Sequence, residues 1–218
     1  MIHPPAAVLF DCDGVLADSE HLINTILAED LTARGWRISP EQARETFLGM
    51  AVSDMLPMLE ARVGPLGPAW VAEMAARIGR RMQAELQPVP GALEAVAAVR
   101  AAGIPIACAS NSGRVELRAK IAALGLSAAF EGRLFSYEDV ARPKPHPDLY
   151  LAAAAACGAA PAACVVVEDS LLGVRAGIAA GCRVLGLARL TEASVLAAVG
   201  AETFADMAAL PRLIGIAR

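Results

Sequence analysis

Two aspartates, Asp11 and Asp13, stand two positions apart near the start of the chain and directly follow the apolar run 6–10. The run is typical of a buried strand, and residues two apart at its end point to one side of the sheet, with Cys12 on the other. Close carboxylates repel each other unless a cation or a proton lies between them. A divalent metal bound by two acids indicates phosphate chemistry. An Asp-rich turn that caps the next helix is the structural alternative.

Length and composition limit the class of protein. The 218 residues suffice for one α/β domain with a modest insertion, and the net charge of −4 without a basic run argues against nucleic-acid binding. Five cysteines form no CxxC pair and no Cys/His cluster, so we expect reduced, buried thiols and no structural zinc. We expect a cytoplasmic protein without a membrane span, because no signal peptide is evident and the Ala-rich stretches are short.

The stretch that follows the aspartates has a helical pattern as far as Leu86, with no convincing strand. Its Met and Trp side chains are typical of a helical-bundle core. Capping and breaking residues divide the stretch into four helices. These helices are expected from Ser19 to near Gly35, from a capping box at 39–42, after Ser53, and from Pro68 to about Leu86.

After the stiff link Pro88–Gly91, strands and helices alternate to the end of the chain. This alternation predicts a parallel sheet with helices on both faces. The helical stretch is therefore an insertion after the first strand. Later strands are expected at 104–109, 134–136, 164–167 and 183–187, and helices at 92–102, 114–124, up to 157, 170–180, 192–199 and after 206.

Polar side chains follow several of these strands. Ligands bind beyond the carboxyl ends of the strands in an open parallel sheet. Each polar group has an ordinary explanation, such as a helix cap or a solvated lysine, but their coincidence at one sheet edge favours a common site. The groups are Ser110 and Asn111 after strand 104–109, Lys144 in a proline-rich loop, and Glu168 and Asp169 after strand 164–167.

These motifs resemble, in order and spacing, those of the haloacid dehalogenase-like hydrolases. The closest subgroup holds β-phosphoglucomutase and small sugar-phosphate phosphatases. The resemblance implies a Rossmann-like α/β/α core with a parallel sheet at residues 1–16 and 89–218, and an inserted all-helical cap domain at 17–88. The matching segments are 11–16 with 18–20 (DCDGVL and DSE), 109–112 (ASNS), 143–148 (PKPHPD) and 167–177 (VEDSLLGVRAG).

The resemblance also implies a role for each acid. Asp11 would be the nucleophile that forms an aspartyl-phosphate, and Asp13 would be the general acid and base. Mg²⁺ would be held by Asp11, by the backbone carbonyl of Asp13 and by Asp169. Glu168 would orient a metal-bound water from outside the ligand set.

The remaining core motifs would hold the phosphoryl group. Ser110 and the backbone N–H of Asn111 would bind phosphoryl oxygens. Lys144 would balance the charge of the transferred group and keep Asp11 ionised.

The implied activity is Mg²⁺-dependent hydrolysis of a small sugar or organic-acid phosphate by a monomer. A dehalogenase would carry a tyrosine in place of Asp13. The cap domain would close about links near Ala17 and Pro88–Gly91. Cap residues would select the substrate, with Glu20, Asn24 and the loop from Phe47 to Ser53 as candidates.

Two alternatives stay open. A β-phosphoglucomutase needs basic cap groups for a second phosphate, but its cap histidine and arginine fall on Ile23 and Val52 in an ungapped alignment, and His21 is displaced by two residues. A non-enzymatic binding protein would have lost a catalytic residue, and none is lost. Hydrolysis is the favoured interpretation.

Overall fold

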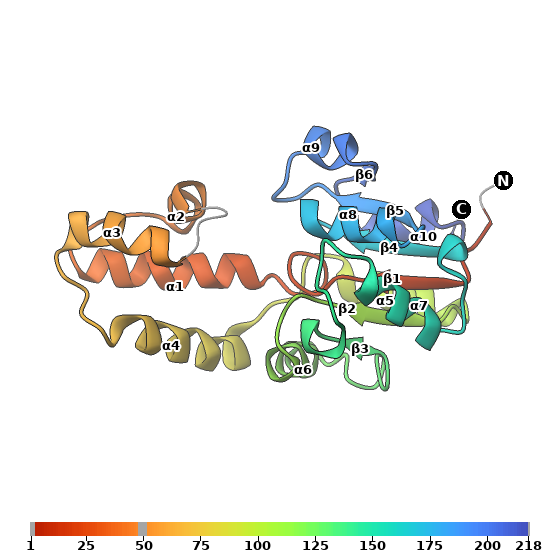
Figure 1. Ribbon diagram of the computed structural model, residues 1–218, viewed down its shortest axis with the longest axis horizontal. Helices are drawn as coiled ribbons and strands as arrows, with labels where there is room; N and C mark the ends of the chain where they lie inside the picture. The colour runs from red at the N-terminus through yellow and green to blue at the C-terminus, as the bar shows by residue number, and fades with distance from the viewer. Residues whose placement is uncertain (1–2, 48–51, 218) are drawn as a thin grey trace. The chain divides into compact units, whose positions relative to one another are not determined.

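The computed structural model describes residues 3–47 and 52–217, with side chains from residue 55 onward in the second range. The chain divides into two compact units. The core unit comprises Met1–Asp18 and Gln87–Arg218, and the helical unit comprises Ser19–Leu86. Figure 1 shows the sheet within the first unit and the long helices of the second.

The core unit is built on a six-stranded sheet in the order β3-β2-β1-β4-β5-β6, with every neighbouring pair parallel. Parallel neighbours require crossover connections, which the intervening helices supply. The predicted Rossmann-like α/β core with a parallel sheet is confirmed. The strands are β1 (Ala7–Phe10), β2 (Ile106–Ala109), β3 (Leu134–Phe135), β4 (Cys164–Glu168), β5 (Arg183–Leu187) and β6 (Glu202–Phe204).

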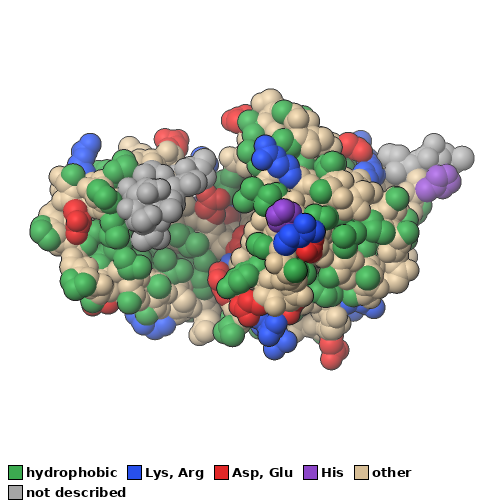
Figure 2. All heavy atoms as spheres, in the orientation of Figure 1, with side chains coloured by type: hydrophobic (Ala, Val, Ile, Leu, Met, Phe, Trp, Pro, Cys, Tyr) green, Lys and Arg blue, Asp and Glu red, His purple; other side chains and the backbone are tan. Residues whose placement is uncertain are grey.

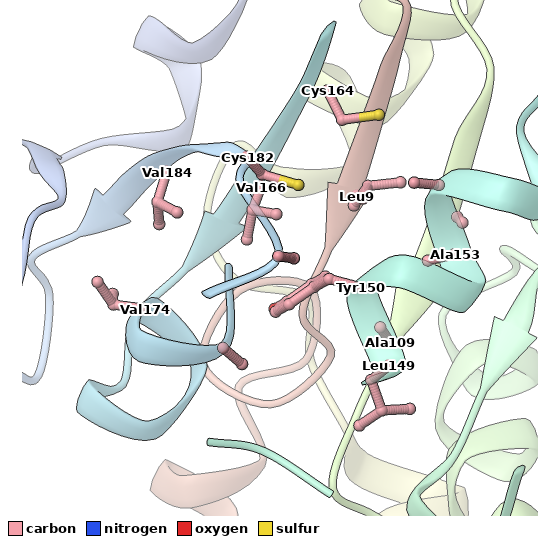
Figure 3. Close-up of a cluster of buried hydrophobic side chains, with 14 of the residues drawn as sticks. Leu9, Ala109, Leu149, Tyr150, Ala153, Cys164, Val166, Val174, Cys182 and Val184 are labelled. Atoms are coloured by element: carbon pink, nitrogen blue, oxygen red, sulfur yellow. The ribbon is translucent and has the colours of Figure 1, made fainter. Parts of the chain in front are cut away.

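One face of the sheet packs against α7, α8 and α9. Figure 3 shows Leu9 and Val166 from the sheet beside Tyr150 and Ala153 of α7 and Val174 of α8. Many of the contributing helical residues are alanines, which allow helices to approach the sheet closely. The helices of the core unit are α5 (Ala92–Ala101), α6 (Arg114–Ala123), α7 (Asp148–Ala156), α8 (Leu171–Ala179), α9 (Ala193–Ala198) and α10 (Leu210–Leu213).

The sheet is buried on its other face as well. Val8 and Phe10 alternate with the residues that face α7, and both are fully buried. The Phe10 ring meets Phe130 edge-on, with ring centroids 6.2 Å apart. Burial on both faces explains why β1 is a continuous apolar run.

The edge strand β6 is absent from the sequence-based prediction, which places only helices in the tail. Two of its three residues are exposed, so the segment lacks the apolar pattern of a buried strand. Its parallel pairing with β5 stabilises it, together with the hydrogen bond from Ala188 N to Phe204 O (2.7 Å). Backbone pairing with a neighbouring strand cannot be read from three residues alone.

The described residues of the helical unit form four helices, which are α1 (Ser19–Ala33), α2 (Pro40–Phe47), α3 (Val52–Val63) and α4 (Trp70–Glu85). The expected capping box is present, because Gln42 N donates to Ser39 Oγ (3.2 Å) and Ser39 N donates to Gln42 Oε1 (2.9 Å). The substrate loop expected from Phe47 to Ser53 lies largely outside the described residues. Phe47 itself ends α2, and α3 already begins at Val52.

Asp30 of α1 connects the end of that helix with α4. Its carboxylate accepts hydrogen bonds from Arg34 Nε (2.8 Å), Trp70 Nε1 (3.0 Å) and Arg77 Nη1 (3.2 Å). Burial raises the pKa of Asp30, but the hydrogen bonds from Trp70 and Arg34 outweigh it, so the net pKa lies below its ordinary value. The ionised form is therefore the stabilising one.

We expect Asp30→Asn to reduce the free energy of unfolding by about 1–2 kcal/mol at pH 7, because a charge-assisted acceptor of three donors becomes a neutral one. The pKa of Asp30 is lower in the folded state than in the unfolded state. This contribution is therefore present at neutral pH and disappears as the pH falls below the ordinary pKa of 3.8. Urea unfolding at pH 7 and pH 3, followed by Trp70 fluorescence in a Trp36→Phe background, measures both effects.

Glu29→Gln is the matched control, since Glu29 is next in sequence and its side chain is half exposed (51%). Its ion pair with Arg81 should contribute less than about 1 kcal/mol. Equal destabilisation by the two substitutions would contradict the role given to Asp30.

Two chain segments connect the core unit with the insertion, and backbone hydrogen bonds join these segments to each other. Asp18 N donates to Gln87 O (2.9 Å), and Val89 N donates to Leu16 O (3.0 Å). Arg189, after β5, donates to Asp18 Oδ1 (3.0 Å). The insertion thus begins and ends at neighbouring points of the core unit.

The described surface is mixed in character. No helix among the described residues has both the length and the apolar character needed to cross a bilayer. On the face in Figure 2, Lys and Arg side chains form separate small groups between acidic and apolar ones. All five cysteines are free, and four of them are buried.

Candidate active site

The site lies where the central strands end. The register pairs Phe10 of β1 with both Cys108 of β2 and Val167 of β4. Asp11 and Glu168 therefore emerge at the same edge, and Asp11 N donates to Val167 O (3.0 Å). The topology thus explains why motifs far apart in the sequence meet at one place.

Lys144 joins the two motifs. Its Nζ lies 2.6 Å from Asp11 Oδ1 and 2.6 Å from Glu168 Oε1, and all three side chains are buried. Burial lowers the pKa of Lys144, but the adjacent Asp11 and Glu168 carboxylates outweigh it, so the net pKa is raised. Lys144 is therefore a fixed ammonium group beside Asp11.

Glu168 is the most highly bonded of these residues. Its Oε1 accepts from Lys144 and from Tyr150 OH (2.8 Å), and its Oε2 accepts from Asp169 N (3.0 Å) and from Ser170 N and Oγ (3.1 and 3.0 Å). Burial raises its pKa, yet Lys144 and the other donors lower it below the ordinary value. The carboxylate also lies against Gly173, where any Cβ would clash.

Glu168 is expected to orient a metal-bound water, and the contacts described for its side chain are to protein donors. Both of its oxygens are occupied by protein donors, and its side chain is fully buried. A carboxylate has about four lone-pair sites, so little acceptor capacity remains. The geometry makes Glu168 an anchor for Lys144 and for the first residues of α8.

Asp11 and Asp169 are the acids best placed to hold a metal ion. Ligand oxygens of Asp11, Glu168 and Asp169 lie within 4.8 Å of one another. Gly14 makes room for this arrangement: its φ is +78°, and a Cβ there would lie only 1.9 Å from Asp169 Oδ2. A residue other than glycine would strain the turn and displace Asp169.

The donor set fits Mg²⁺. The available groups are the carboxylate oxygens of Asp11 and Asp169, which are hard ligands of the kind that Mg²⁺ prefers. Burial raises the pKa of Asp11 to about 7 in the metal-free protein, although Lys144 opposes the shift. A divalent cation would offset the repulsion between the acids that contributes to this shift.

Asn111 fixes the loop that carries Lys144. Its Oδ1 accepts from Lys144 N (3.0 Å), and its Nδ2 donates to Lys144 O (3.1 Å). Ser110, which is buried, accepts at Oγ from Ser112 N (3.0 Å). The two expected phosphate-binding residues are therefore held beside the lysine loop, with the Asn111 side chain engaged by the backbone of that loop.

Asp13 contacts residues that sequence reasoning did not place in the site. Its Oδ1 lies 2.5 Å from Lys120 Nζ, and its Oδ2 accepts from Ser112 Oγ (2.9 Å). Lys120 also lies 3.1 Å from Ser112 Oγ and 2.6 Å from Glu116 Oε1. Burial lowers the pKa of Lys120, but the contacts with Asp13 and Glu116 raise it by more than burial lowers it. The net pKa of Lys120 is therefore above its ordinary value.

A signal for Lys120 exists in the sequence. Leu117, Ile121 and Leu124 are buried, and Lys120 lies on the same helical stripe. A lysine on a buried stripe needs a partner. No comparable signal marks Tyr150 as a donor to Glu168, because a tyrosine on a buried stripe is ordinary core.

The two candidate substrate residues lie in α1 of the helical unit. Asn24 is mostly buried, and its Nδ2 donates to Glu20 O (2.8 Å) within the helix.

Comparison with known proteins decides the family. The sequence pattern described as haloacid dehalogenase-like hydrolase matches residues 5–181. The chain belongs to the haloacid dehalogenase-like hydrolases. The resemblance based on the four motifs is thereby confirmed, and these hydrolases generally use Mg²⁺.

Several curated members of the haloacid dehalogenase-like hydrolases are similar over most of the chain. The 6-phosphogluconate phosphatase of Escherichia coli is 28% identical over 95% of this chain and 93% of its own length. Hexitol phosphatase B of Escherichia coli is 32% identical over 81% of each chain. In contrast, the chain spans only 19% of the chloroplastic protein SUPPRESSOR OF QUENCHING 1 of Arabidopsis thaliana, to which it is 31% identical.

Solved haloacid dehalogenase-like hydrolases share the fold. A hydrolase of this family from Deinococcus radiodurans, with bound phosphate and sodium, is 33% identical with a TM-score of 0.86 and covers 98% of this chain and 97% of its own. CbbY from Rhodobacter sphaeroides, in complex with phosphate, is 28% identical with a TM-score of 0.69 over 96% of both chains. The phosphatase relatives support a phosphoric monoester hydrolase.

Proposed function

We propose that the chain is a Mg²⁺-dependent phosphatase that hydrolyses small phosphorylated metabolites through an aspartyl-phosphate on Asp11. The observation that carries the proposal is the buried group in which Lys144 contacts both Asp11 and Glu168, beside Asp169. A nucleophile, a fixed positive charge and a second acid for a metal are the requirements of this chemistry.

In the first step, an oxygen of Asp11 bonds to phosphorus as the bond from phosphorus to the leaving oxygen breaks. Asp13 gives its proton to that oxygen, so an alcohol leaves and Asp13 becomes a carboxylate. Lys144, 2.6 Å from Asp11 Oδ1, stabilises negative charge that develops on the transferred group.

In the second step, the Asp13 carboxylate takes a proton from water as the water oxygen bonds to phosphorus. The bond between phosphorus and Asp11 then breaks, inorganic phosphate leaves, and Asp13 is again protonated. Ser110 and the backbone N–H of Asn111 are proposed to hold phosphoryl oxygens in both steps.

Asp11, Asp169 and the backbone carbonyl of Asp13 are the proposed ligands of Mg²⁺. When bound, the ion would neutralise phosphoryl charge and orient the phosphate. Glu168 supports these residues by holding Lys144 and the start of α8.

Sugar and organic-acid phosphates are the proposed substrates, in line with the activities that the names of the 6-phosphogluconate and hexitol phosphatases state for those proteins. Substrate choice is proposed to depend on the helical unit as a cap domain, with Glu20 and Asn24 as the first residues to test. A monomer in the cytoplasm is the proposed setting, consistent with five free cysteines.

Phosphate release from a set of phosphorylated metabolites tests the function. With Mg²⁺ we expect release from at least one sugar or organic-acid phosphate, and a loss of at least about a hundredfold after removal of the metal with EDTA. Mg²⁺ added back should restore the rate. Undiminished release in EDTA would contradict the metal requirement.

The same set separates hydrolysis from mutase activity when both anomers of glucose 1-phosphate are included. Formation of glucose 6-phosphate faster than inorganic phosphate would replace the proposed function with that of a mutase. Binding of substrates without either product would favour a non-enzymatic role.

A further inference from the structure

The structure assigns Lys120 a part in the reaction: it is a positioning residue that, with Ser112, orients the carboxylate of Asp13 for proton transfer. The inference rests on the proposed function, because Asp13 is the proposed acid and base. It adds two residues, from α6 and from the loop before it, to the groups that govern the chemistry.

Both oxygens of Asp13 have a fixed partner. Lys120 Nζ contacts Oδ1 at 2.5 Å, and Ser112 Oγ donates to Oδ2 at 2.9 Å. Lys120 and Ser112 also contact each other at 3.1 Å, which closes a triangle of three side chains. Two bonds to different oxygens fix the plane of a carboxylate, whereas a single bond leaves it free to rotate.

The burial of Lys120 is difficult to explain by stability alone. Its side chain is only 3% exposed, while the side chains of Asp13 and Glu116 are 35% and 57% exposed. An i,i+4 pair with Glu116 forms equally well at the helix surface and requires no burial. A buried ammonium group loses solvation, and an apolar side chain of similar size often serves stability as well. The buried position of Lys120 is therefore explained by its contact with Asp13.

Orientation matters because Asp13 must reach the leaving oxygen first and a water later. General acid–base catalysis contributes about 10²- to 10⁴-fold, and a misplacement of about 1 Å removes up to about 10²-fold. Loss of Lys120 should therefore remove the part of the rate that depends on protonating the leaving group. Reactions whose leaving group needs no proton should be little affected.

Two substrates of similar size separate these cases. Phenyl phosphate releases a basic phenolate that needs a proton, while p-nitrophenyl phosphate releases a weakly basic one that does not. The value of kcat/KM reports the steps up to formation of the phosphorylated enzyme. We expect Lys120→Met to lower kcat/KM for phenyl phosphate by about 10- to 100-fold, and for p-nitrophenyl phosphate by less than about threefold.

Three further variants sharpen the test. Asp13→Asn should also lower kcat/KM mainly for phenyl phosphate, and by more than Lys120→Met does. Ser112→Ala should lower it mainly for phenyl phosphate as well, but by less. Glu116→Gln removes the other ionic partner of Lys120 without touching Asp13, and it should leave both values within about twofold of wild type. Lys120→Met should fold, because Asp13 and Glu116 both reach solvent; if it does not, Ser112→Ala carries the test.

An equal loss on both substrates, or no loss on either, would overturn the inference while leaving the phosphatase function intact. A loss of kcat/KM for phenyl phosphate alone in Glu116→Gln would also overturn it, since the effect would then come from the ion pair at the helix surface and not from the contact with Asp13. Wild-type protein that releases phosphate from no phosphomonoester would instead refute the proposed function. The outcomes therefore distinguish the two proposals.

Discussion

Asp11→Asn should abolish turnover, with a loss of at least about 10³-fold in kcat. The amide has nearly the shape of the carboxylate but cannot attack phosphorus. Rapid quenching after mixing with ³²P-labelled substrate should show labelled protein for the wild type and none for the variant. Because Asp11 is also a proposed metal ligand, the assay is made over a range of Mg²⁺ concentrations, and high Mg²⁺ should not restore activity.

The same substitution should not unfold the protein. Burial raises the pKa of Asp11 to about 7, so in metal-free protein the stability associated with the protonated form is lost as the pH rises through that value. The neutral Asn side chain avoids this loss, and Lys144 keeps its contact with Glu168. In EDTA at pH 8, the variant should be at least as stable as wild type. Turnover within about tenfold of wild type would exclude Asp11 as the nucleophile.

Lys144→Met should damage both stability and activity. It leaves fully buried Glu168 without its ionic partner, and breaking a buried pair in this way costs about 3–5 kcal/mol. It also removes the positive charge beside Asp11, so kcat/KM should fall by about 10²- to 10³-fold. Urea unfolding and phosphate release on the same preparation measure the two effects.

A second variant separates the two effects of Lys144. The double variant Lys144→Met/Glu168→Gln removes the unpaired charge as well, so it should regain most of the stability but none of the activity. Arg142→Met is the matched control, because this nearby cation is 58% exposed and pairs only with Asp148 among the contacts described for its side chain. It should alter stability by less than about 1 kcal/mol. Recovery of activity in the double variant would show that Lys144 acts only through folding.

The position of the site was predictable from the sequence because it follows from topology. Asp11, Ser110 and Asp169 each come at or just after the end of a parallel strand, and parallel strands bring their carboxyl ends together. Lys144 was predictable from the family motif. The sequence order of these groups therefore sufficed to place them at one edge.

The partners of the buried charges were not predictable in the same way. The pairs Lys120–Asp13 and Lys144–Glu168 join residues 107 and 24 positions apart. Such pairs form where a loop or a helix packs against the ends of the strands, which no local pattern encodes. Glu168 shows this most clearly, since its five donors come from its own turn, from α7 and from the lysine loop.

The pairing of the two connecting segments also bears on how this chain could diversify. Since Asp18 and Gln87 are hydrogen-bonded neighbours, the inserted residues close a loop whose ends the rest of the protein already holds together. The entropy of loop closure changes only slowly with length, so inserts of different size or sequence carry similar penalties there. The insertion can thus be replaced at this junction while the strand ends that carry Asp11 and Asp169 stay as they are.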